Sequence, residues 1–205
     1  MYLILLYMNK IIIEKLSNLG CFKFGKFKLK TGQISPFYIN LRDIISDPDI
    51  LKTLSRIIYK KFIEIEHLKC IEEGTILSIC GLPYAGIPIA SYISCMYNIP
   101  LLILRKERKD YGTKKMIEGV NNNRNKIILI DDIITSGSSI NESLIYFKDF
   151  EIVDILVIID REQKKQCNFE YNSLYKITEI FQFLKNQKLV SKEDYEQSIL
   201  FLKGK

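Results

Sequence analysis

The chain has 205 residues, of which 47% are hydrophobic and 26% charged, with 10 glycines and 5 prolines. A chain of this length and balance buries one sizeable core, so we expect a single globular domain over 1–205 and exclude collagen-like, low-complexity and largely disordered proteins. The 30 basic and 24 acidic side chains leave a net charge of +6, which suits a polyanionic partner and an ordinary solvated surface equally well.

Cysteine and histidine usage excludes several kinds of site. The chain has 5 cysteines, an odd number, with no C-x-x-C pair. This argues against a disulfide framework and a structural zinc site and fits a reducing cytoplasm. The one histidine, His67, lies in the polar stretch EIEHLK and is expected on the surface or in ordinary packing. A multi-histidine metal centre is therefore excluded, and catalysis is not expected to use histidine.

The N-terminal region is predicted to hold an extension, a helix and a strand. Residues 1–7 are too few to cross a membrane and carry no signal-peptide cleavage site, so we predict an extension. Apolar positions at helical spacing predict an amphipathic helix over 8–19, which Gly20 ends. The next segment, CFKFGKFKLKTG, alternates Phe and Lys and predicts a strand that ends in a turn.

Alternation of basic and aromatic residues also occurs where single-stranded nucleic acid binds, because bases stack on Phe and phosphates pair with Lys. One short strand is a small platform for that purpose, and no helix-turn-helix pattern accompanies it. We therefore expect neither a nucleic-acid partner nor a membrane partner.

The middle of the chain alternates apolar runs with helix-like stretches. Asp47 and Pro48 begin the first long helix as N-cap and first residue. Strands are predicted at ILSIC (76–80), LLIL (101–104), IILI (127–130) and IVDILVII (152–159), with helices at 87–97 and 139–149. This order predicts an α/β fold with a mostly parallel sheet flanked by helices.

The C-terminal region follows a polar loop over 162–172. A strand is predicted at 173–177, and two helices follow it, with Thr178 and Ser191 as their N-caps. Asp194, three residues after Ser191, completes a capping box.

The carboxyl ends of the predicted strands carry the chemistry, because ligands bind there in open parallel sheets. In IILIDDIITSGSS, a buried strand leads to Asp131 and Asp132 and then to a turn of small residues over 135–139. The turn can offer backbone N–H groups and hydroxyls to a phosphate, and the acids can hold ribose hydroxyls or a hydrated Mg²⁺. No G-x-x-x-x-G-K-[ST] accompanies them, which excludes a kinase of the Walker type.

A second polar segment, RKERKDYGTKK at 105–115, is too highly charged to be buried. Such a run is ordinarily a solvated loop. Opposite a phosphate cradle, however, a mobile cationic loop can close over a diphosphate and neutralise the charge that develops as it leaves.

These motifs resemble those of the type I phosphoribosyltransferases, in which an apolar strand, two acids and a Thr-x-Gly-Ser turn form the phosphoribosyl-diphosphate signature. KTGQISPFYIN (30–40), the 105–115 segment and DREQ (160–163) narrow the resemblance to the orotate phosphoribosyltransferase family. The sequence and spacing of these motifs are more similar to the N-terminal half of bifunctional UMP synthase than to the bacterial enzymes. The resemblance implies a central, mostly parallel sheet with a small N-terminal hood and a mobile catalytic loop.

The resemblance also implies a reaction: Mg²⁺-dependent transfer of the 5-phosphoribosyl group from phosphoribosyl diphosphate to N1 of orotate, giving orotidine 5'-monophosphate and diphosphate in pyrimidine biosynthesis. The family's transition state is oxocarbenium-like. Such chemistry needs charge stabilisation and positioning more than a covalent catalyst, which agrees with the lack of a catalytic His or Cys.

Site roles carry over from the family motifs to matching positions. Asp131 and Asp132 would hold the ribose hydroxyls and, through water, Mg²⁺. Arg161 would bind the orotate carboxylate, and Lys109 would neutralise the leaving diphosphate. The other members, assigned to substrate binding, are Lys30, Tyr38, Ile39, Tyr84, Ala85, Arg105, Lys106 (also catalytic), Tyr111, Ile133, Ile134, Thr135, Ser136, Gly137, Ser138 and Ser139.

Two positions depart from the bacterial pattern. Ala85 follows Tyr84 where bacterial relatives carry Lys, so a cation is missing from the turn that contacts diphosphate. Tyr111 stands where they carry His, which removes a titrating group.

The resemblance implies partners as well as substrates. Each active site would be shared in a homodimer, with the catalytic loop closing over the neighbouring subunit's site. We expect no decarboxylase domain after Lys205, and therefore expect a separate orotidine monophosphate decarboxylase to act next, in a complex. Two alternatives remain: a phosphoribosyltransferase for another base, and a non-catalytic regulator that senses phosphoribosyl diphosphate and would not need the 105–115 loop.

Overall fold

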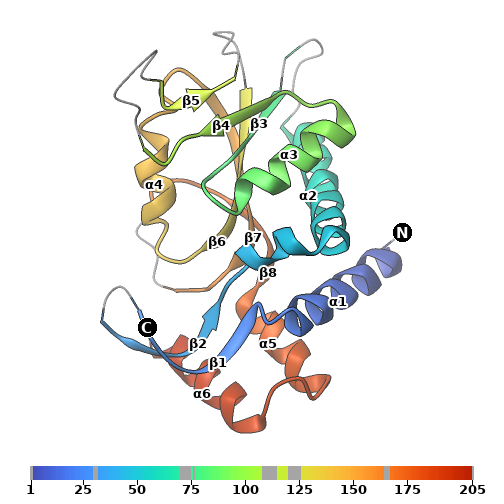
Figure 1. Cartoon of the computed structure of the whole chain (residues 1–205), viewed down its shortest axis with the longest axis vertical. Coiled ribbons are helices and arrows are strands. Elements are labelled where there is room, and N and C mark those ends of the chain that lie inside the picture. Colours follow the sequence, from blue (N-terminus) through green and yellow to red (C-terminus); the bar gives the residue numbers. More distant parts are fainter. Residues whose placement is uncertain are drawn as a thin grey trace.

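A six-stranded sheet forms the centre of the chain in the computed structural model (Figure 1). The structure describes residues 2–29, 32–69, 75, 77–107, 115–119, 126–163 and 167–204, with side chains from Lys10 onward. The strand order is β5-β4-β3-β6-β7-β8, and every neighbouring pair is parallel except β4 with β5. The strands are β3 (Leu77–Gly81), β4 (Leu101–Leu104), β5 (Ile117–Glu118), β6 (Lys126–Ile134), β7 (Glu151–Asp160) and β8 (Asn172–Lys176). The predicted mostly parallel α/β architecture is confirmed.

Helices cover both faces of this sheet because its central strands are apolar on both sides. Ile128 and Ile130 of β6 pack in one buried cluster with residues of α2 (Pro48–Leu68) and α3 (Gly86–Tyr97). Ile127 and Leu129 point to the other face and pack with α4 (Ser138–Leu144). Alternate residues of one strand therefore fill separate cores, as expected for a buried parallel strand.

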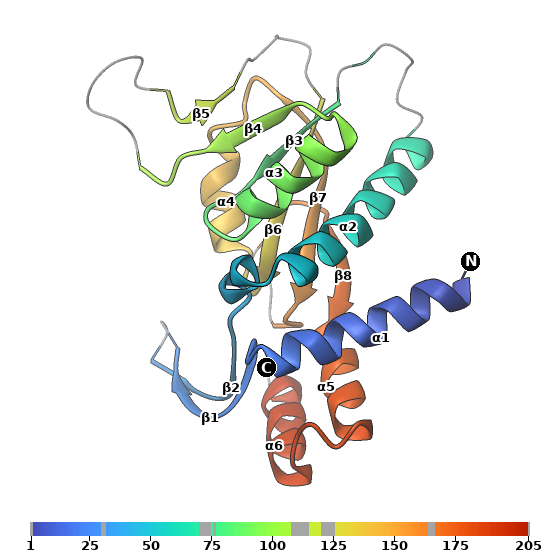
Figure 2. The same cartoon turned by 45° about the vertical axis from the view of Figure 1, so that its right-hand side comes forward.

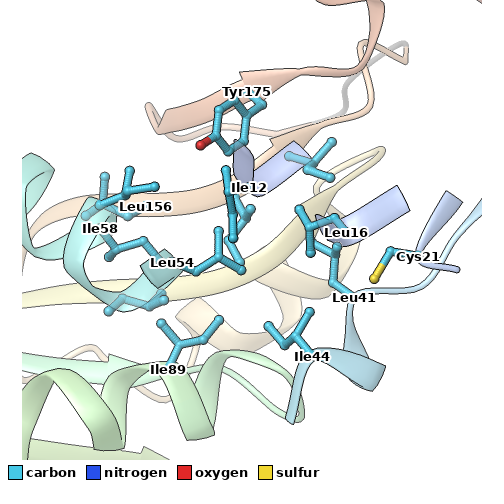
Figure 3. Packing of buried hydrophobic residues seen from close by; sticks show 14 of the residues in the cluster. Ile12, Leu16, Cys21, Leu41, Ile44, Leu54, Ile58, Ile89, Leu156 and Tyr175 are labelled. Carbon is cyan, nitrogen blue, oxygen red and sulfur yellow. The ribbon is translucent and has the colours of Figure 1, made fainter. Parts of the chain in front are cut away.

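A smaller layer, the hood, lies at one end of the sheet (Figures 1 and 2). It consists of the antiparallel pair β1 (Phe22–Lys28) and β2 (Ile34–Ile39) with α1 (Tyr2–Asn18), α5 (Ile177–Asn186) and α6 (Lys192–Lys203). A short 3-10 turn, η1 (Arg42–Ser46), links β2 to α2. The hood shares its core with the sheet: Ile12 and Leu16 of α1 lie beside Leu54 of α2 and Tyr175 of β8 (Figure 3).

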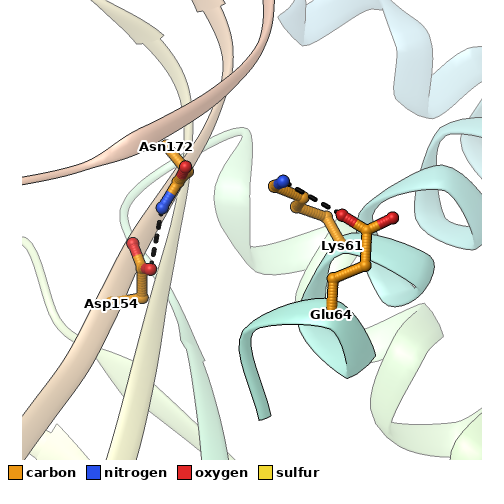
Figure 4. A network of polar contacts seen from close by, with 4 residues as sticks. All are labelled: Lys61, Glu64, Asp154 and Asn172. Atoms are coloured by element: carbon orange, nitrogen blue, oxygen red, sulfur yellow. Dashed lines mark hydrogen bonds and ion pairs between the residues drawn. The ribbon is translucent and has the colours of Figure 1, made fainter. Parts of the chain in front are cut away.

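Local polar contacts fix the ends of elements. Asp47 Oδ1 accepts hydrogen bonds from the N–H groups of Asp49 and Ile50 at 3.0 and 2.9 Å, which confirms it as the N-cap of α2. Ser191 is likewise confirmed as the N-cap of α6, since its Oγ accepts from Asp194 N at 3.0 Å. Figure 4 shows Asn172 of β8 donating to Asp154 of β7 at 2.8 Å, and the pair Lys61–Glu64 on the surface of α2.

Several predicted boundaries were wrong. Helix α1 begins at Tyr2, so residues 2–7 continue the helix predicted from residue 8. Helix α4 ends at Leu144 rather than 149, because the chain turns tightly through Tyr146 and Phe147 to bury the Phe147 ring. Helix α5 has Lys176 rather than Thr178 at its N-cap, and Thr178 lies in the first turn.

The described residues contain no helix that is both long and apolar enough to cross a membrane. Cys21, Cys80, Cys95 and Cys167 are free thiols, and burial raises the pKa of Cys21 and of Cys80 to about 12. Within the same residues, no three His, Cys, Asp or Glu side chains gather as metal ligands. His67 is exposed near the end of α2, as predicted.

Candidate active site

The carboxyl ends of four parallel strands meet on the side of the sheet that faces the hood. Strands β3, β4, β6 and β7 end there at Gly81, Leu104, Ile134 and Asp160. The hood reaches this rim directly, because Arg161, just after β7, donates from Nη2 to Ser35 Oγ of β2 at 3.0 Å. The predicted polar segments therefore converge between the sheet and the hood.

The two adjacent acids lie inside a strand rather than after it. Strand β6 continues four residues beyond the predicted run, to Ile134, and pairs Asp131 with Val157 of β7. Asp131 is buried and Asp132 is half-buried. Each carboxylate accepts through Oδ1 from the next backbone N–H, at 2.9 and 2.8 Å, which fixes its direction.

Burial raises the pKa of Asp131, and the neighbouring charge of Asp132 raises it further, while the charge of Arg42 acts in the opposite direction. The folded protein therefore holds a proton on Asp131 at pH values where the unfolded chain has lost it. As the pH rises above 3.8, the ordinary pKa of an aspartate, Asp131 lowers the free energy of unfolding. This loss of stability reaches its full size once the pH exceeds the raised pKa of Asp131.

Replacing Asp131 with Asn should therefore raise the melting temperature at pH 7, because Asn does not bring a buried charge into the folded state. The gain should shrink as the pH falls through the raised pKa, since wild-type Asp131 then becomes neutral. Thermal unfolding of both proteins between pH 4 and pH 8 measures this. A difference in melting temperature that is the same at every pH would contradict the assignment.

The turn that follows the acids begins a short helix. Gly137 is the N-cap of α4 with a φ of +82°, a conformation that favours glycine. A Cβ there would also lie 2.9 Å from Cys167 Cβ, so the 167–170 segment packs directly against the turn. Ser136 Oγ lies 3.1 Å from Ser138 Oγ, and Thr135 is half-buried. Ser138 and Ser139, both exposed, are the first residues of the helix, and the Ser138 N–H donates to Ser136 Oγ at 3.4 Å.

The two isoleucines of the motif differ in placement. Ile134 is 1% exposed and packs in the core, while its carbonyl oxygen accepts from Arg161 N at 3.0 Å. Ile133 is half-buried against the other cluster. Among the predicted binding residues, Ile39 is likewise a core side chain, 8% exposed, whereas Tyr38 is 43% exposed. For Ile134 and Ile39, only the backbone is therefore placed to contact a substrate.

The turn after β3 is held against β6 by two glycines. A Cβ on Gly86 would lie 2.2 Å from the Ile130 carbonyl oxygen, and one on Gly81 would lie 2.4 Å from the carbonyl carbon of Gly86. Only glycine permits this approach. The turn presents Tyr84, which is 53% exposed, while Ala85 beside it is buried. The peptide bond between Pro83 and Tyr84 is cis.

Two cations face the Tyr84 ring. The guanidinium carbon of Arg42 lies 5.9 Å from the ring centroid and Lys106 Nζ lies 5.2 Å from it. The Arg105 side chain instead pairs with Glu118 of β5. Arg42 was missed in the sequence, although it lies two residues after the 30–40 motif, because only the tertiary fold brings it to Tyr84. It shares no ion pair with any acid of the described ranges, and it supplies a positive charge near the position where Ala85 supplies none.

Arg161 is a charged side chain in a buried position. It is 8% exposed, its guanidinium lies 4.7 Å from the Phe37 ring centroid, and burial lowers its pKa. An arginine nevertheless stays charged in a protein. Its Nε has no hydrogen-bond partner, and no acid in the described part of the chain forms an ion pair with it. A buried positive charge is thus left available for an anion between sheet and hood.

Three predicted site residues lie outside the described residues: Lys30, Lys109 and Tyr111. The structure therefore brings together Asp131, Asp132, the 135–139 turn, Tyr84, Lys106 and Arg161, and it adds Arg42 and Ser35 to them.

Curated proteins that resemble this chain indicate one family. The chain is 36% identical over 163 residues to the orotate phosphoribosyltransferase of Caenorhabditis elegans, a match that covers 78% of this chain and 69% of the relative. The chain belongs to the orotate phosphoribosyltransferase family. It is also 34% identical over 198 residues to the uridine 5'-monophosphate synthase of Bos taurus, with 93% of this chain and 40% of that protein covered. No protein-family model matches.

A solved structure extends the likeness to the fold. The structure of Leishmania donovani UMP synthase superposes with a TM-score of 0.79 at 26% identity, over 96% of this chain and 42% of that one. This chain thus spans less than half the length of these two UMP synthases. The predicted type I phosphoribosyltransferase fold, with its hood over a mostly parallel sheet, is confirmed.

Proposed function

We propose that this site transfers the 5-phosphoribosyl group from phosphoribosyl diphosphate to orotate, giving orotidine 5'-monophosphate and diphosphate in pyrimidine biosynthesis. The observation that carries the proposal is the buried guanidinium of Arg161, which forms no ion pair with any acid of the described residues. Of the common nucleobases and their precursors, orotate brings a carboxylate, which a guanidinium binds through charge-assisted hydrogen bonds. The buried Phe37 ring supports the Arg161 guanidinium at a centroid distance of 4.7 Å.

The remaining residues keep the roles that the family motifs imply. Asp131 and Asp132 bind the ribose hydroxyls, and the 135–139 turn binds the 5'-phosphate through its N–H groups and hydroxyls. Lys106 and Arg42, which flank Tyr84, attract the diphosphate. As the bond from C1' to the diphosphate oxygen breaks and the bond to N1 of orotate forms, positive charge develops on the ribose and negative charge on diphosphate. The carboxylates and the cations stabilise these charges respectively.

Magnesium fits the donor set of this site. Mg²⁺ prefers oxygen ligands and is usually held by one or two carboxylates together with substrate phosphates. Asp131 and Asp132 each have one oxygen beyond the Oδ1 that accepts a backbone N–H, so they can hold a hydrated ion against the substrate. The ion would neutralise diphosphate charge, while the side chains orient the ribose.

The proposal also includes a cytoplasmic homodimer that shares its catalytic loop, and a complex with a separate orotidine monophosphate decarboxylase. The UMP synthase relatives support a link to the next step in UMP formation. Light scattering with and without added decarboxylase tests both associations. A monomeric mass, or no mixed species at micromolar concentrations, would contradict them.

The test of function is the loss of orotate absorbance when the purified protein is mixed with phosphoribosyl diphosphate and Mg²⁺, with uracil, hypoxanthine and adenine as parallel substrates. We expect orotate alone to be consumed. Turnover of another base would contradict the role of Arg161, and binding of phosphoribosyl diphosphate without any turnover would favour a regulator.

A further inference from the structure

We propose that Glu162 is a positioning residue for Arg161 and thereby a determinant of selectivity for an acidic base. This inference rests on the proposed function. Glu162 directly follows Arg161, and its carboxylate also contacts the hood: Oε2 accepts from the backbone N–H of Thr178 in the first turn of α5 at 2.9 Å. One residue thus joins the segment that carries Arg161 to a hood helix.

The backbone at Glu162 is held in an uncommon conformation. Its φ is +52°, in the left-handed region that residues other than glycine, asparagine and aspartate seldom adopt. Asp160 stabilises this turn, because its Oδ1 accepts from Glu162 N at 2.7 Å while its Oδ2 accepts from the Tyr171 hydroxyl at 2.8 Å. The residues on both sides of Arg161 are therefore held by hydrogen bonds to the carboxylates of Asp160 and Glu162.

The contact with α5 closes a ring of interactions around the guanidinium. Arg161 lies on the Phe37 ring, and Phe37 packs edge to face against Phe181 of α5 at a centroid distance of 4.9 Å. Thr178, three residues before Phe181 on the same helix, donates to Glu162. Helix α5 therefore supports the Phe37 ring beneath Arg161 and also holds the backbone next to Arg161 through Glu162. Loss of the Glu162 contact would allow the Arg161 backbone to move relative to the Phe37 ring.

Glu179 provides a matched control at the same helix end. Its Oε2 accepts from Lys176 N at 3.3 Å, so it also caps the N-terminus of α5, but it is exposed and has no bond to the Arg161 segment. Removing either carboxylate leaves one backbone N–H at the start of α5, that of Thr178 or that of Lys176, without its acceptor. Only removal of Glu162 also frees the Arg161 turn.

The experiment measures kcat and the KM of each substrate for wild type, Glu162→Ala, Glu162→Gln and Glu179→Ala, together with melting temperatures. We expect Glu162→Ala to raise the KM for orotate about tenfold, because small misplacements of a binding group are costly, with the KM for phosphoribosyl diphosphate unchanged. Glu162→Gln should restore the wild-type value, since its amide oxygen can still accept from Thr178. Glu179→Ala should lower the melting temperature without raising the KM for orotate.

Thr178→Pro removes the same hydrogen bond from the donor side and leaves Glu162 in place, and proline is tolerated in the first turn of a helix. This variant replaces Glu162→Ala in the experiment if Glu162→Ala does not fold. It should raise the KM for orotate and leave the KM for phosphoribosyl diphosphate unchanged. Equal effects of Glu162→Ala and Glu179→Ala, or a rise in both KM values, would overturn the inference. Absence of orotate turnover by wild type would instead overturn the proposed function, so the two failures are distinguishable.

Discussion

Replacing Arg161 with methionine should lower kcat/KM for orotate roughly 100-fold or more, since truncating one partner of a buried hydrogen-bonded charge pair costs about 2–5 kcal/mol. The KM for phosphoribosyl diphosphate should stay close to the wild-type value, because Arg161 faces the hood at Ser35 and Phe37 rather than the 135–139 turn. Steady-state kinetics with each substrate varied in turn measures both values.

The melting temperature of Arg161→Met distinguishes a loss of orotate binding from a loss of folded protein. The Arg161 guanidinium is buried, and burial disfavours its charge. Methionine of similar length fills the same space against Phe37 without a desolvated charge, so the melting temperature should not fall. Arg56→Met, at an exposed position on α2, is the matched control and should change neither property. Orotate turnover near the wild-type rate in Arg161→Met would remove Arg161 from the base pocket.

Replacing Lys109 with alanine should lower kcat by about 100- to 1000-fold, the usual effect of removing one group that stabilises charge in a transition state. Lys109 lies outside the described residues, but the segment it belongs to leaves the rim at Arg105 and Lys106, beside Tyr84. Binding of phosphoribosyl diphosphate should largely survive, because the acids, the 135–139 turn and Lys106 remain.

Single-turnover kinetics and equilibrium binding separate these two outcomes for Lys109. The exposed Lys148, beyond α4, is the control: Lys148→Ala carries the same loss of charge and should leave kcat unchanged. If Lys109→Ala weakened binding as much as it slowed turnover, Lys109 would be a ground-state contact rather than a group that acts on the leaving diphosphate.

The sheet and the phosphate turn could be predicted because their signals are local. Apolar runs such as LLIL at 101–104 give buried strands wherever they occur in an α/β chain, and the structure has β4 at those residues. Asp47 and Ser191 cap helices through bonds to residues at most three positions away. The local pattern failed where a tertiary contact determines the end of a helix. Helix α4 ends five residues before the predicted end because the Phe147 ring packs in the core.

The residues that complete the site could not be found this way. Arg42 and Tyr84 are 42 positions apart in sequence number and meet only because η1 and the turn after β3 share one rim. Ser35 and Arg161, 126 residues apart, meet because the hood folds onto the sheet. Glu162 stood inside a recognised motif, yet its bond to Thr178 depends on where α5 begins, and the sequence pattern misplaced that start.

The most direct test of the account is a crystal structure of the protein with orotidine 5'-monophosphate bound. The account predicts that the base carboxylate lies within hydrogen-bond distance of the Arg161 guanidinium. It also places the ribose hydroxyls at Asp131 and Asp132 and the phosphate on the 135–139 turn. A nucleotide whose carboxylate faces solvent, or whose phosphate lies away from that turn, would contradict it.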